Sequence, residues 1–201
     1  MKLSPGQTLV LATANEGKIN ELTGLLSPYS LKITTLKELN LKEPDEIGSN
    51  FKENAIIKAR ACAYASGFPA LADDSGLAVR ALGGQPGIFT ANWAGPHRDF
   101  MHAMTKVHTE LVRLEGHPDR RAQFICCLVL WFPDDTHYVF EGKIEGELAW
   151  PIRGNSNLGF DPMFVPLGFK KTFGEMTLQE KQKVSHRRAA FAQFARECLE
   201  F

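Results

Sequence analysis

The feature that most constrains the fold is a change in the spacing of apolar residues near the N-terminus. Residues 8–12 form a mostly apolar run, and residues 13–18 are polar or small. Beyond them, Ile19, Leu22 and Leu25 recur at intervals of three residues. A short apolar run indicates a buried strand, and the interval of three indicates a helix with one buried face. A strand, a polar turn and a helix in this order predict a protein of the α/β class.

The rest of the chain continues to alternate between strand-like and helix-like patterns. Apolar or alternating runs predict further strands at residues 31–36, 70–72, 77–82, 123–132 and 138–149. We expect the last two to form an antiparallel pair. Apolar residues at helical spacing predict further helices at residues 51–65 and 100–114.

The C-terminal third contains a loop signal followed by a helix signal. Residues 151–166 are rich in Gly, Asn and Pro, so we expect a shaped loop on the surface. Thr177 and Glu180 have the form of a capping box and predict one last helix, with Phe191 and Phe194 facing inward. The sequence has no internal repeat and no linker, and its 201 residues suit one domain, residues 1–201.

Charge and cysteine content exclude several classes of protein. Lys plus Arg equals Asp plus Glu at 23 each, which leaves no overall field to attract nucleic acid or an anionic membrane. The four cysteines include no Cys-x-x-Cys pair, so we expect buried free thiols in a reducing compartment. The first apolar run is too short for a signal peptide or a membrane span. These features predict a cytoplasmic protein.

The turn at residues 13–18 is the first candidate site. It joins a strand end to a helix N-terminus, where backbone N–H groups and the helix dipole favour phosphate. Lys18 adds a positive charge, and Thr13 and Asn15 add hydrogen bonds. The alternative is a helix that is merely capped by Asn15. The sequence contains neither a Walker loop nor a Gly-x-Gly-x-x-Gly motif, which excludes two common nucleotide-binding folds.

Adjacent Asp73 and Asp74 form the second candidate site, which we expect at the end of a buried strand. Two neighbouring carboxylates repel each other unless a cation compensates them. Mg²⁺ is the natural partner, because it prefers oxygen ligands and is commonly bound by one or two carboxylates plus substrate phosphates. One carboxylate then holds the metal while it or its neighbour accepts a proton from water. The alternative is a solvated acidic turn.

Two further segments carry weaker signals. Residues 154–164 combine glycine with aromatic residues, which suits enclosure of a flat base, although a structural Ω-loop explains the composition as well. Residues 185–188 follow Lys181 by one helical turn and form a small basic cluster, which solvated surface charge also explains.

Taken together and in order, the motifs are far more specific than each one alone. They are Thr13-x-Asn15-x-x-Lys18, Phe51-x-x-Asn54-Ala55, Ala72-Asp73-Asp74-Ser75-Gly76-Leu77, Gly84-x-Pro86-Gly87, Gly159-Phe160-Asp161-Pro162 and Ser185-His186-Arg187. This set resembles the non-canonical purine nucleoside triphosphate pyrophosphatases, the inosine triphosphatase or Ham1-like family. The resemblance covers residues 9–190, nearly the whole chain.

The resemblance implies an elongated α/β fold of two lobes around a central mixed β-sheet, assembled as a homodimer. It implies a Mg²⁺-dependent enzyme whose partner is a small-molecule nucleotide. The expected reaction hydrolyses dITP, ITP or XTP to the monophosphate and pyrophosphate and so removes non-canonical purines from the nucleotide pool.

The resemblance also implies roles for individual residues. Asp74 becomes the proton acceptor and a Mg²⁺ ligand, and Arg187 lies near the 6-keto oxygen that distinguishes hypoxanthine and xanthine from adenine. A second metal carboxylate is either Asp45 or Glu46, and Asp73 is a further metal candidate from the charge argument. The substrate-binding positions are Thr13, Ala14, Asn15, Glu16, Gly17, Lys18, Ser75, Leu158, Gly159, Phe160, Asp161, Lys181, His186 and Arg187.

Three positions depart from the family pattern: Ala14 replaces a common Gly, Asn92 replaces a frequent Arg, and Leu158 replaces an aromatic residue. The last is expected to matter most, because stacking of a base on an aromatic ring is worth ~1–3 kcal/mol. We expect a raised KM for this reason, and Leu158→Phe should lower the KM for ITP. An unchanged or higher KM would contradict the idea.

Two other functions compete with this interpretation. A haloacid-dehalogenase-type phosphatase also uses an aspartate after a strand, but it releases orthophosphate and its Asp-x-Asp spacing is absent. A nucleotide sensor without turnover would bind ITP and form no pyrophosphate.

Overall fold

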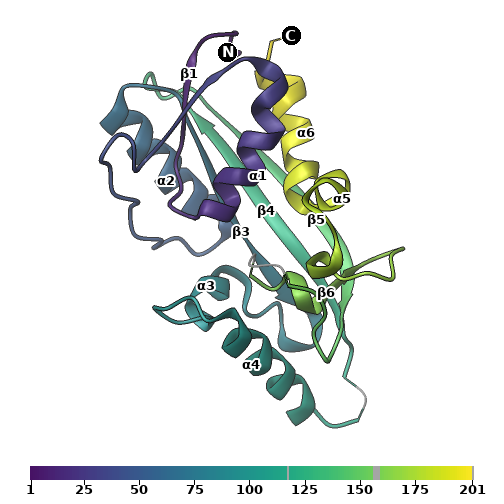
Figure 1. Cartoon of the computed structure of the whole chain (residues 1–201). Coiled ribbons are helices and arrows are strands. Elements are labelled where there is room, and N and C mark those ends of the chain that lie inside the picture. The colour runs from purple at the N-terminus through teal and green to yellow at the C-terminus, as the bar shows by residue number, and fades with distance from the viewer. Residues whose placement is uncertain (117, 156–158, 201) are drawn as a thin grey trace. The chain divides into compact units, whose positions relative to one another are not determined.

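The computed structural model describes residues 1–116, 118–155 and 159–200 of the chain. A six-stranded sheet has the order β2-β1-β3-β4-β5-β6 (Figure 1). Strand β1 pairs in parallel with both β2 and β3, and β5 pairs antiparallel with β6, so the sheet is mixed. The strands are β1 (Thr8–Leu11), β2 (Lys32–Thr35), β3 (Ala70–Val79), β4 (Arg121–Trp131), β5 (His137–Leu148) and β6 (Phe164–Pro166). The α/β class and the central mixed sheet are therefore confirmed.

Six α-helices accompany the sheet in the described part of the chain. They are α1 (Glu16–Leu26), α2 (Phe51–Ser66), α3 (Thr90–Trp93), α4 (Phe100–Arg113), α5 (Leu178–Val184) and α6 (His186–Cys198). None of the described helices has the length and apolar content needed to cross a bilayer.

The chain divides into two compact units. Unit 1 contains residues 1–74, 126–142 and 187–201, and unit 2 contains residues 75–125 and 143–186. Strands β3, β4 and β5 contribute residues to both units.

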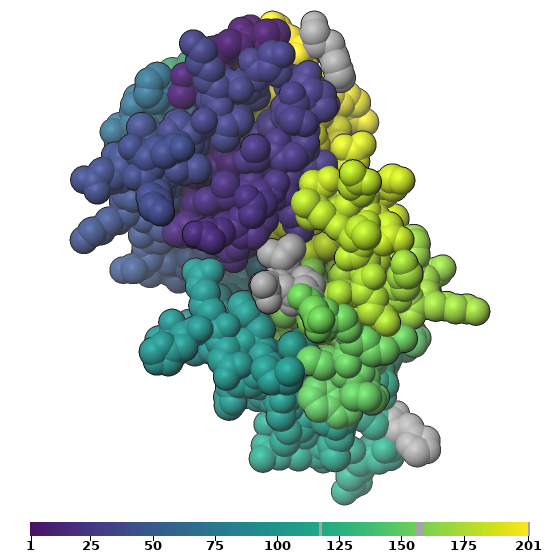
Figure 2. Space-filling view, in the orientation of Figure 1, coloured from purple at the N-terminus to yellow at the C-terminus, as the bar shows by residue number. Residues whose placement is uncertain are grey.

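Unit 1 has an apolar core on each face of its part of the sheet. Alternate strand residues point to opposite faces, so Leu9 packs with α1 and α6 while Val10 packs with α2. In the space-filling view, α1 lies at the front of unit 1 (Figure 2). The two neighbouring cysteines lie on opposite faces of the sheet, since Cys126 belongs to the core with α1 and α6 and Cys127 to the core with α2. All four cysteines are buried free thiols, as predicted.

Unit 2 has a single aromatic-rich core beneath the amphipathic helix α4. Met104, Val107 and Leu111 of this helix pack with a cluster that includes Phe124 and Phe164. The predicted apolar stripe therefore faces the core from Phe100 to Leu111, whereas Leu114 lies beyond the end of the helix and is exposed.

Several predicted boundaries were wrong. We expected strands 70–72 and 77–82 on either side of an acidic turn, but β3 runs without interruption from Ala70 to Val79. The acidic pair follows strand geometry because both carboxylates find cationic partners and need no solvent-exposed turn.

The expected surface loop at residues 151–166 and the single last helix also differ from prediction. Residues 160–164 are buried, and the segment ends in strand β6, because its aromatic and Met side chains join the core of unit 2. The capping box at Thr177 is confirmed, but its helix ends at Val184. Ser185 adopts extended backbone angles and separates α5 from α6.

Candidate active site

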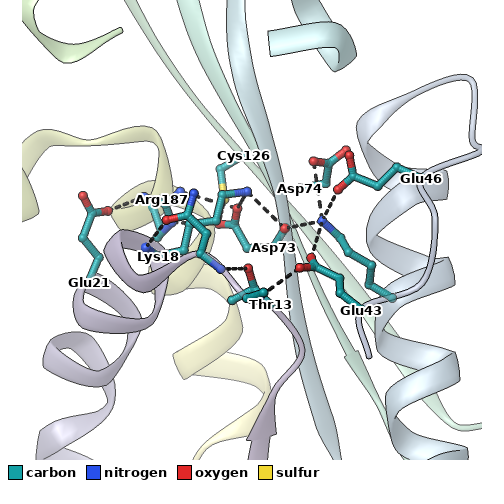
Figure 3. Close-up of polar contacts among 12 residues, drawn as sticks. Thr13, Lys18, Glu21, Glu43, Glu46, Asp73, Asp74, Cys126 and Arg187 are labelled. Atoms are coloured by element: carbon teal, nitrogen blue, oxygen red, sulfur yellow. Dashed lines mark hydrogen bonds and ion pairs between the residues drawn. The ribbon is translucent and has the colours of Figure 1, made fainter. Parts of the chain in front are cut away.

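The acidic pair lies inside strand β3 rather than after it. Asp73 and Asp74 are both buried, with 0% and 5% of their surface exposed. Because consecutive strand residues point to opposite faces, the two carboxylates lie in different surroundings. Figure 3 shows Asp74 near Glu46 and Asp73 near Lys18 and Arg187. Each carboxylate therefore has its own set of partners.

Asp74 belongs to a cluster of carboxylates around the buried ammonium group of Lys58. The Lys58 Nζ lies 2.6 Å from Glu46 Oε1, 3.7 Å from Asp74 Oδ1 and 3.7 Å from Glu43 Oε1. It also donates a hydrogen bond to the main-chain carbonyl of Asp73 at 2.9 Å. Glu46 and Glu43 come from the polar segment before α2, and Lys58 comes from α2 itself. Three acidic side chains, two from this segment and one from β3, thus face one cation.

Burial and neighbouring charges act against each other in this cluster, and a different one prevails at each residue. Burial raises the pKa of Asp74 above the ordinary value, and this outweighs the opposing charge of Lys58. Burial alone would lower the pKa of Lys58, but the charges of Asp74 and Glu46 outweigh it and raise that pKa. Asp74 is consequently a stronger base than an exposed aspartate, and Lys58 stays charged.

Asp73 belongs to a second ion network, in which its own carboxylate is fully buried. Its Oδ1 lies 2.6 Å from Lys18 Nζ, and its Oδ2 accepts hydrogen bonds from Arg187 Nε at 2.7 Å and Cys126 Sγ at 3.1 Å. Arg187 Nη1 also bonds the carboxylate of Glu21. Burial would raise the pKa of Asp73, but the charges of Arg187 and Lys18 hold it well below its usual range. Asp73 is an ionised partner of two cations and points away from the Lys58 cluster.

The turn at residues 13–18 has the predicted position between β1 and α1. Asn15 caps α1, since its side chain accepts from the Lys18 N–H at 3.2 Å, and the Asn15 N–H donates to Thr13 Oγ1 at 3.1 Å. The Ala14 N–H donates to Glu43 Oε2 at 2.9 Å. Glu43 therefore connects this turn to the carboxylate cluster of Asp74.

Several further candidates lie in unit 2. Lys181 forms a buried ion pair with Asp161, at 2.5 Å between Nζ and Oδ2. His186 is buried and stacks on Phe124, with ring centroids 4.9 Å apart. Phe160 is also buried and makes an edge contact with Phe100.

Some sequence candidates contribute less to this arrangement. Asp45 is exposed, whereas neighbouring Glu46 contacts Lys58. Ser75 and Gly159 belong to unit 2, and Gly159 has a φ of +67°, which few other residues adopt. Leu158 lies outside the described residues.

Sequence reasoning missed four functional candidates: Lys58, Glu43, Glu21 and Cys126. A signal existed for Lys58, because it follows Ala55 by three residues on the alanine-rich face of α2 that packs on the sheet. A lysine on a buried helix face needs a partner for its charge. Glu43 and Glu21 lacked such a signal.

The donor chemistry of the Asp74 cluster fits a hard divalent cation. Carboxylate oxygens are its preferred ligands, and one or two of them suffice when substrate phosphates provide the others. Among the residues described here, no group of three or more His, Cys, Asp or Glu side chains is arranged to hold a metal ion. The protein contribution would therefore be a pair of carboxylates, of which Asp74 and Glu46 are the best placed.

Comparison with known proteins gives a consistent result. A dITP/XTP pyrophosphatase from Ruegeria pomeroyi is 49% identical over 196 residues, covering 96% of both chains. One from Zymomonas mobilis is 48% identical, covering 98% of this chain and 94% of that protein. The structure of a HAM1 protein from Coxiella burnetii matches with a TM-score of 0.86 and 37% identity, covering 94% and 97%. The model of the Ham1 family matches residues 9–197, and the chain therefore belongs to the Ham1 family.

Proposed function

We propose that this protein hydrolyses non-canonical purine nucleoside triphosphates, namely dITP, ITP and XTP, to the monophosphate and pyrophosphate. The observation that carries the proposal is the meeting of Asp74, Glu46 and two lysines at one part of β3, beside the capped turn of α1. The names of the Ruegeria and Zymomonas relatives support the same reaction.

The triphosphate binds at the N-terminus of α1. The turn at residues 13–18 lies at the positive end of the dipole of this 11-residue helix, which favours a bound anion. Lys18 and Lys58 add two positive charges from different helices. Together these groups hold the phosphates in register and balance much of their charge.

Asp74 and Glu46 would hold Mg²⁺, and the contact of Glu46 with the same Lys58 ammonium that Asp74 contacts favours Glu46 over Asp45 as the second carboxylate. When bound, Mg²⁺ supplies neutralising charge to the phosphate oxygens. Lys58, which contacts both carboxylates, keeps them from repelling each other before substrate arrives.

Asp74 accepts the proton of the attacking water. The water oxygen forms a bond to the α-phosphorus as the bond to the α–β bridging oxygen breaks, and pyrophosphate leaves with that electron pair. The raised pKa of Asp74 suits this role, because it makes the carboxylate a better proton acceptor than an exposed aspartate.

Base selection is assigned to the candidates in unit 2 and to Arg187. Gly159, Phe160, Lys181 and His186 contact the nucleotide, and an Arg187 N–H donates to the 6-keto oxygen. A 6-amino group would place donor against donor, and such a buried mismatch costs ~1–3 kcal/mol. Adenine is thus rejected by polarity more than by shape.

The proposal also includes the cellular location, the oligomeric state and the binding partners of the enzyme. We propose a cytoplasmic homodimer that acts on free nucleotides and binds neither nucleic acid nor membranes. The equal numbers of acidic and basic residues support the second part.

The test is a panel of nucleoside triphosphates with Mg²⁺, assayed separately for pyrophosphate and orthophosphate. We expect pyrophosphate from ITP, dITP and XTP, and far less from ATP, whose 6-amino group faces the Arg187 donor. Release of orthophosphate would favour a phosphatase. A thermal shift with ITP and no pyrophosphate would favour a sensor, and either result would overturn the proposal.

A further inference from the structure

Asp73 contacts both lysine ammonium groups that lie near the proposed phosphate site. Lys18 Nζ lies 2.6 Å from Asp73 Oδ1 and 3.3 Å from its main-chain carbonyl oxygen. Lys58 Nζ donates to that same carbonyl oxygen at 2.9 Å. Lys18 comes from the first turn of α1 and Lys58 from α2 (Figure 3). One strand residue therefore connects cations that arrive from two helices.

Two ammonium groups on one carbonyl oxygen lie within a few ångströms of each other and repel. Their positions must be fixed by groups of opposite charge. Glu46 and Asp74 do so for Lys58. For Lys18, the Asp73 carboxylate provides the close negative charge.

The Asp73 carboxylate is itself held in place by Arg187 and Cys126. Arg187 Nε and Cys126 Sγ donate to its Oδ2, and Arg187 is in turn bonded to Glu21. The Asp73 side chain is fully buried, so it has no route to substrate except through its partners. This support fixes the orientation of the carboxylate, whose Oδ1 lies 2.6 Å from Lys18 Nζ and also accepts a longer hydrogen bond from Arg187 Nη2 at 3.4 Å.

We propose that Asp73 is a positioning residue: it fixes the Lys18 ammonium beside that of Lys58, so that both cations meet the same polyphosphate. The inference rests on the proposed function and deepens it, because it gives the buried carboxylate a part in substrate binding. It also separates the roles of the acidic pair, since Asp74 faces the metal and water and Asp73 faces the cations.

The first experiment compares Lys18→Met, Asp73→Asn and the double variant in ITP hydrolysis. If Asp73 acts through Lys18, Asp73→Asn raises KM more than it lowers kcat and reproduces most of the loss of Lys18→Met. The double variant then has a kcat/KM within about twofold of Lys18→Met alone, because the two changes remove one interaction. If the fold-losses in kcat/KM of the two single variants multiplied in the double variant, the proposal would be overturned.

The double variant keeps the test decisive if Asp73→Asn does not fold. Asp73→Asn removes the carboxylate charge that contacts both Lys18 and Arg187, so this variant is the one at risk. The double variant removes one charge of each sign and leaves Arg187 paired with Glu21. Its comparison with Lys18→Met decides the question even if Asp73→Asn does not fold.

A second readout needs no turnover. Brief labelling of lysines with acetic anhydride, followed by peptide mass spectrometry, reports how tightly each ammonium group is held. The side chains of Lys18 and Lys58 are 17% and 2% exposed. We expect folded Asp73→Asn to label severalfold faster at Lys18 and at an unchanged rate at Lys58, which serves as the internal control. An unchanged rate at Lys18 would overturn the inference, whereas a wild-type protein inactive on ITP would instead overturn the proposed function.

Discussion

The two units of the chain bury different kinds of side chain. The core of unit 1 contains charged residues from several elements, including Glu21, Lys58, Asp73 and Arg187. Unit 2 buries an aromatic cluster around Phe124 and, among its described residues, charges that include the Asp161–Lys181 pair.

The difference shows that unit 1 buries charges at a cost in folding free energy. Burying a charge is unfavourable unless partners and hydrogen bonds compensate it, and an apolar replacement is often as stable or more so. Unit 1 retains a buried network of charges that stability alone does not require. We infer that this network exists to hold the groups that bind and cleave the triphosphate, and that unit 2 is stabilised mainly by packing.

The largest expected effect tests whether the chemistry depends on unit 1. Asp74→Asn removes the proton acceptor and a metal carboxylate with little change in size. We expect the kcat for ITP to fall by about 10²–10⁴-fold with the fold intact, as measured by pyrophosphate release and circular dichroism. Glu46→Gln should also lose most activity, and Asp45→Asn much less. If Asp74→Asn kept most of its turnover, the inference that the chemistry depends on unit 1 would be wrong.

The next prediction concerns the buried pair in unit 2. Lys181→Met leaves the Asp161 carboxylate buried without its cation, and we expect a loss of about 3–5 kcal/mol in the free energy of unfolding. Urea denaturation measures this loss. Lys181→Met combined with Asp161→Asn removes both charges and should recover part of it. Equal losses in the single and double variants would show that packing, and not charge, stabilises this position.

A smaller effect is expected when the cation at the centre of the carboxylate cluster is removed. Lys58 and a divalent ion are drawn to the same side chains, Asp74 and Glu46. Lys58→Met should therefore bind Mg²⁺ about tenfold more tightly, equivalent to ~1.4 kcal/mol. Thermal shift against Mg²⁺ concentration measures it, and Lys52→Met, on the exposed face of the same helix, is the matched control. A weaker Mg²⁺ response than in the wild type would contradict a metal site at these carboxylates.

The smallest expected effect concerns chemical labelling of the cysteines. This labelling reports on unit 1 alone, because all four cysteines lie there. Burial raises the pKa of the Cys62 and Cys198 thiols to about 11 and that of Cys127 to about 12. We expect iodoacetamide at pH 8 to label the native protein very slowly and the denatured protein fully. Labelling of Lys181→Met at low urea then shows whether unit 1 opens when unit 2 is destabilised. Rapid labelling of the native wild type would contradict the burial of these thiols.

The same thiols predict a dependence of stability on pH. In the unfolded chain they ionise near the ordinary value of 9.0, while in the folded chain three of them ionise only near 11 to 12. A raised pKa for an acid means that the folded state holds its protons longer than the unfolded state. Stability should therefore fall as the pH rises above about 9, which urea midpoints at pH 8 and 10 can measure.

Local patterns in the sequence were sufficient for most elements. The apolar spacing predicted β1, α1, α2 and α4, and the Thr177 capping box predicted the start of α5. These features depend on neighbouring residues in the chain, so their signal is complete within a short window. The prediction was wrong at Asp73 and Asp74, where a pair typical of turns lies inside a strand. Polarity alone favours a turn, and only the distant cations reverse that preference.

The sequence by itself determined the α/β class and the family resemblance, and it predicted functional roles for Asp74 and Lys18. The tertiary structure decided how the charges are paired: it placed Lys58 among the carboxylates near Asp74, and it joined Asp73 to Arg187 more than a hundred residues away. The physical reason is that a strand alternates its faces while helices bring in side chains from elsewhere, so the partner of a buried charge depends on packing rather than on sequence spacing.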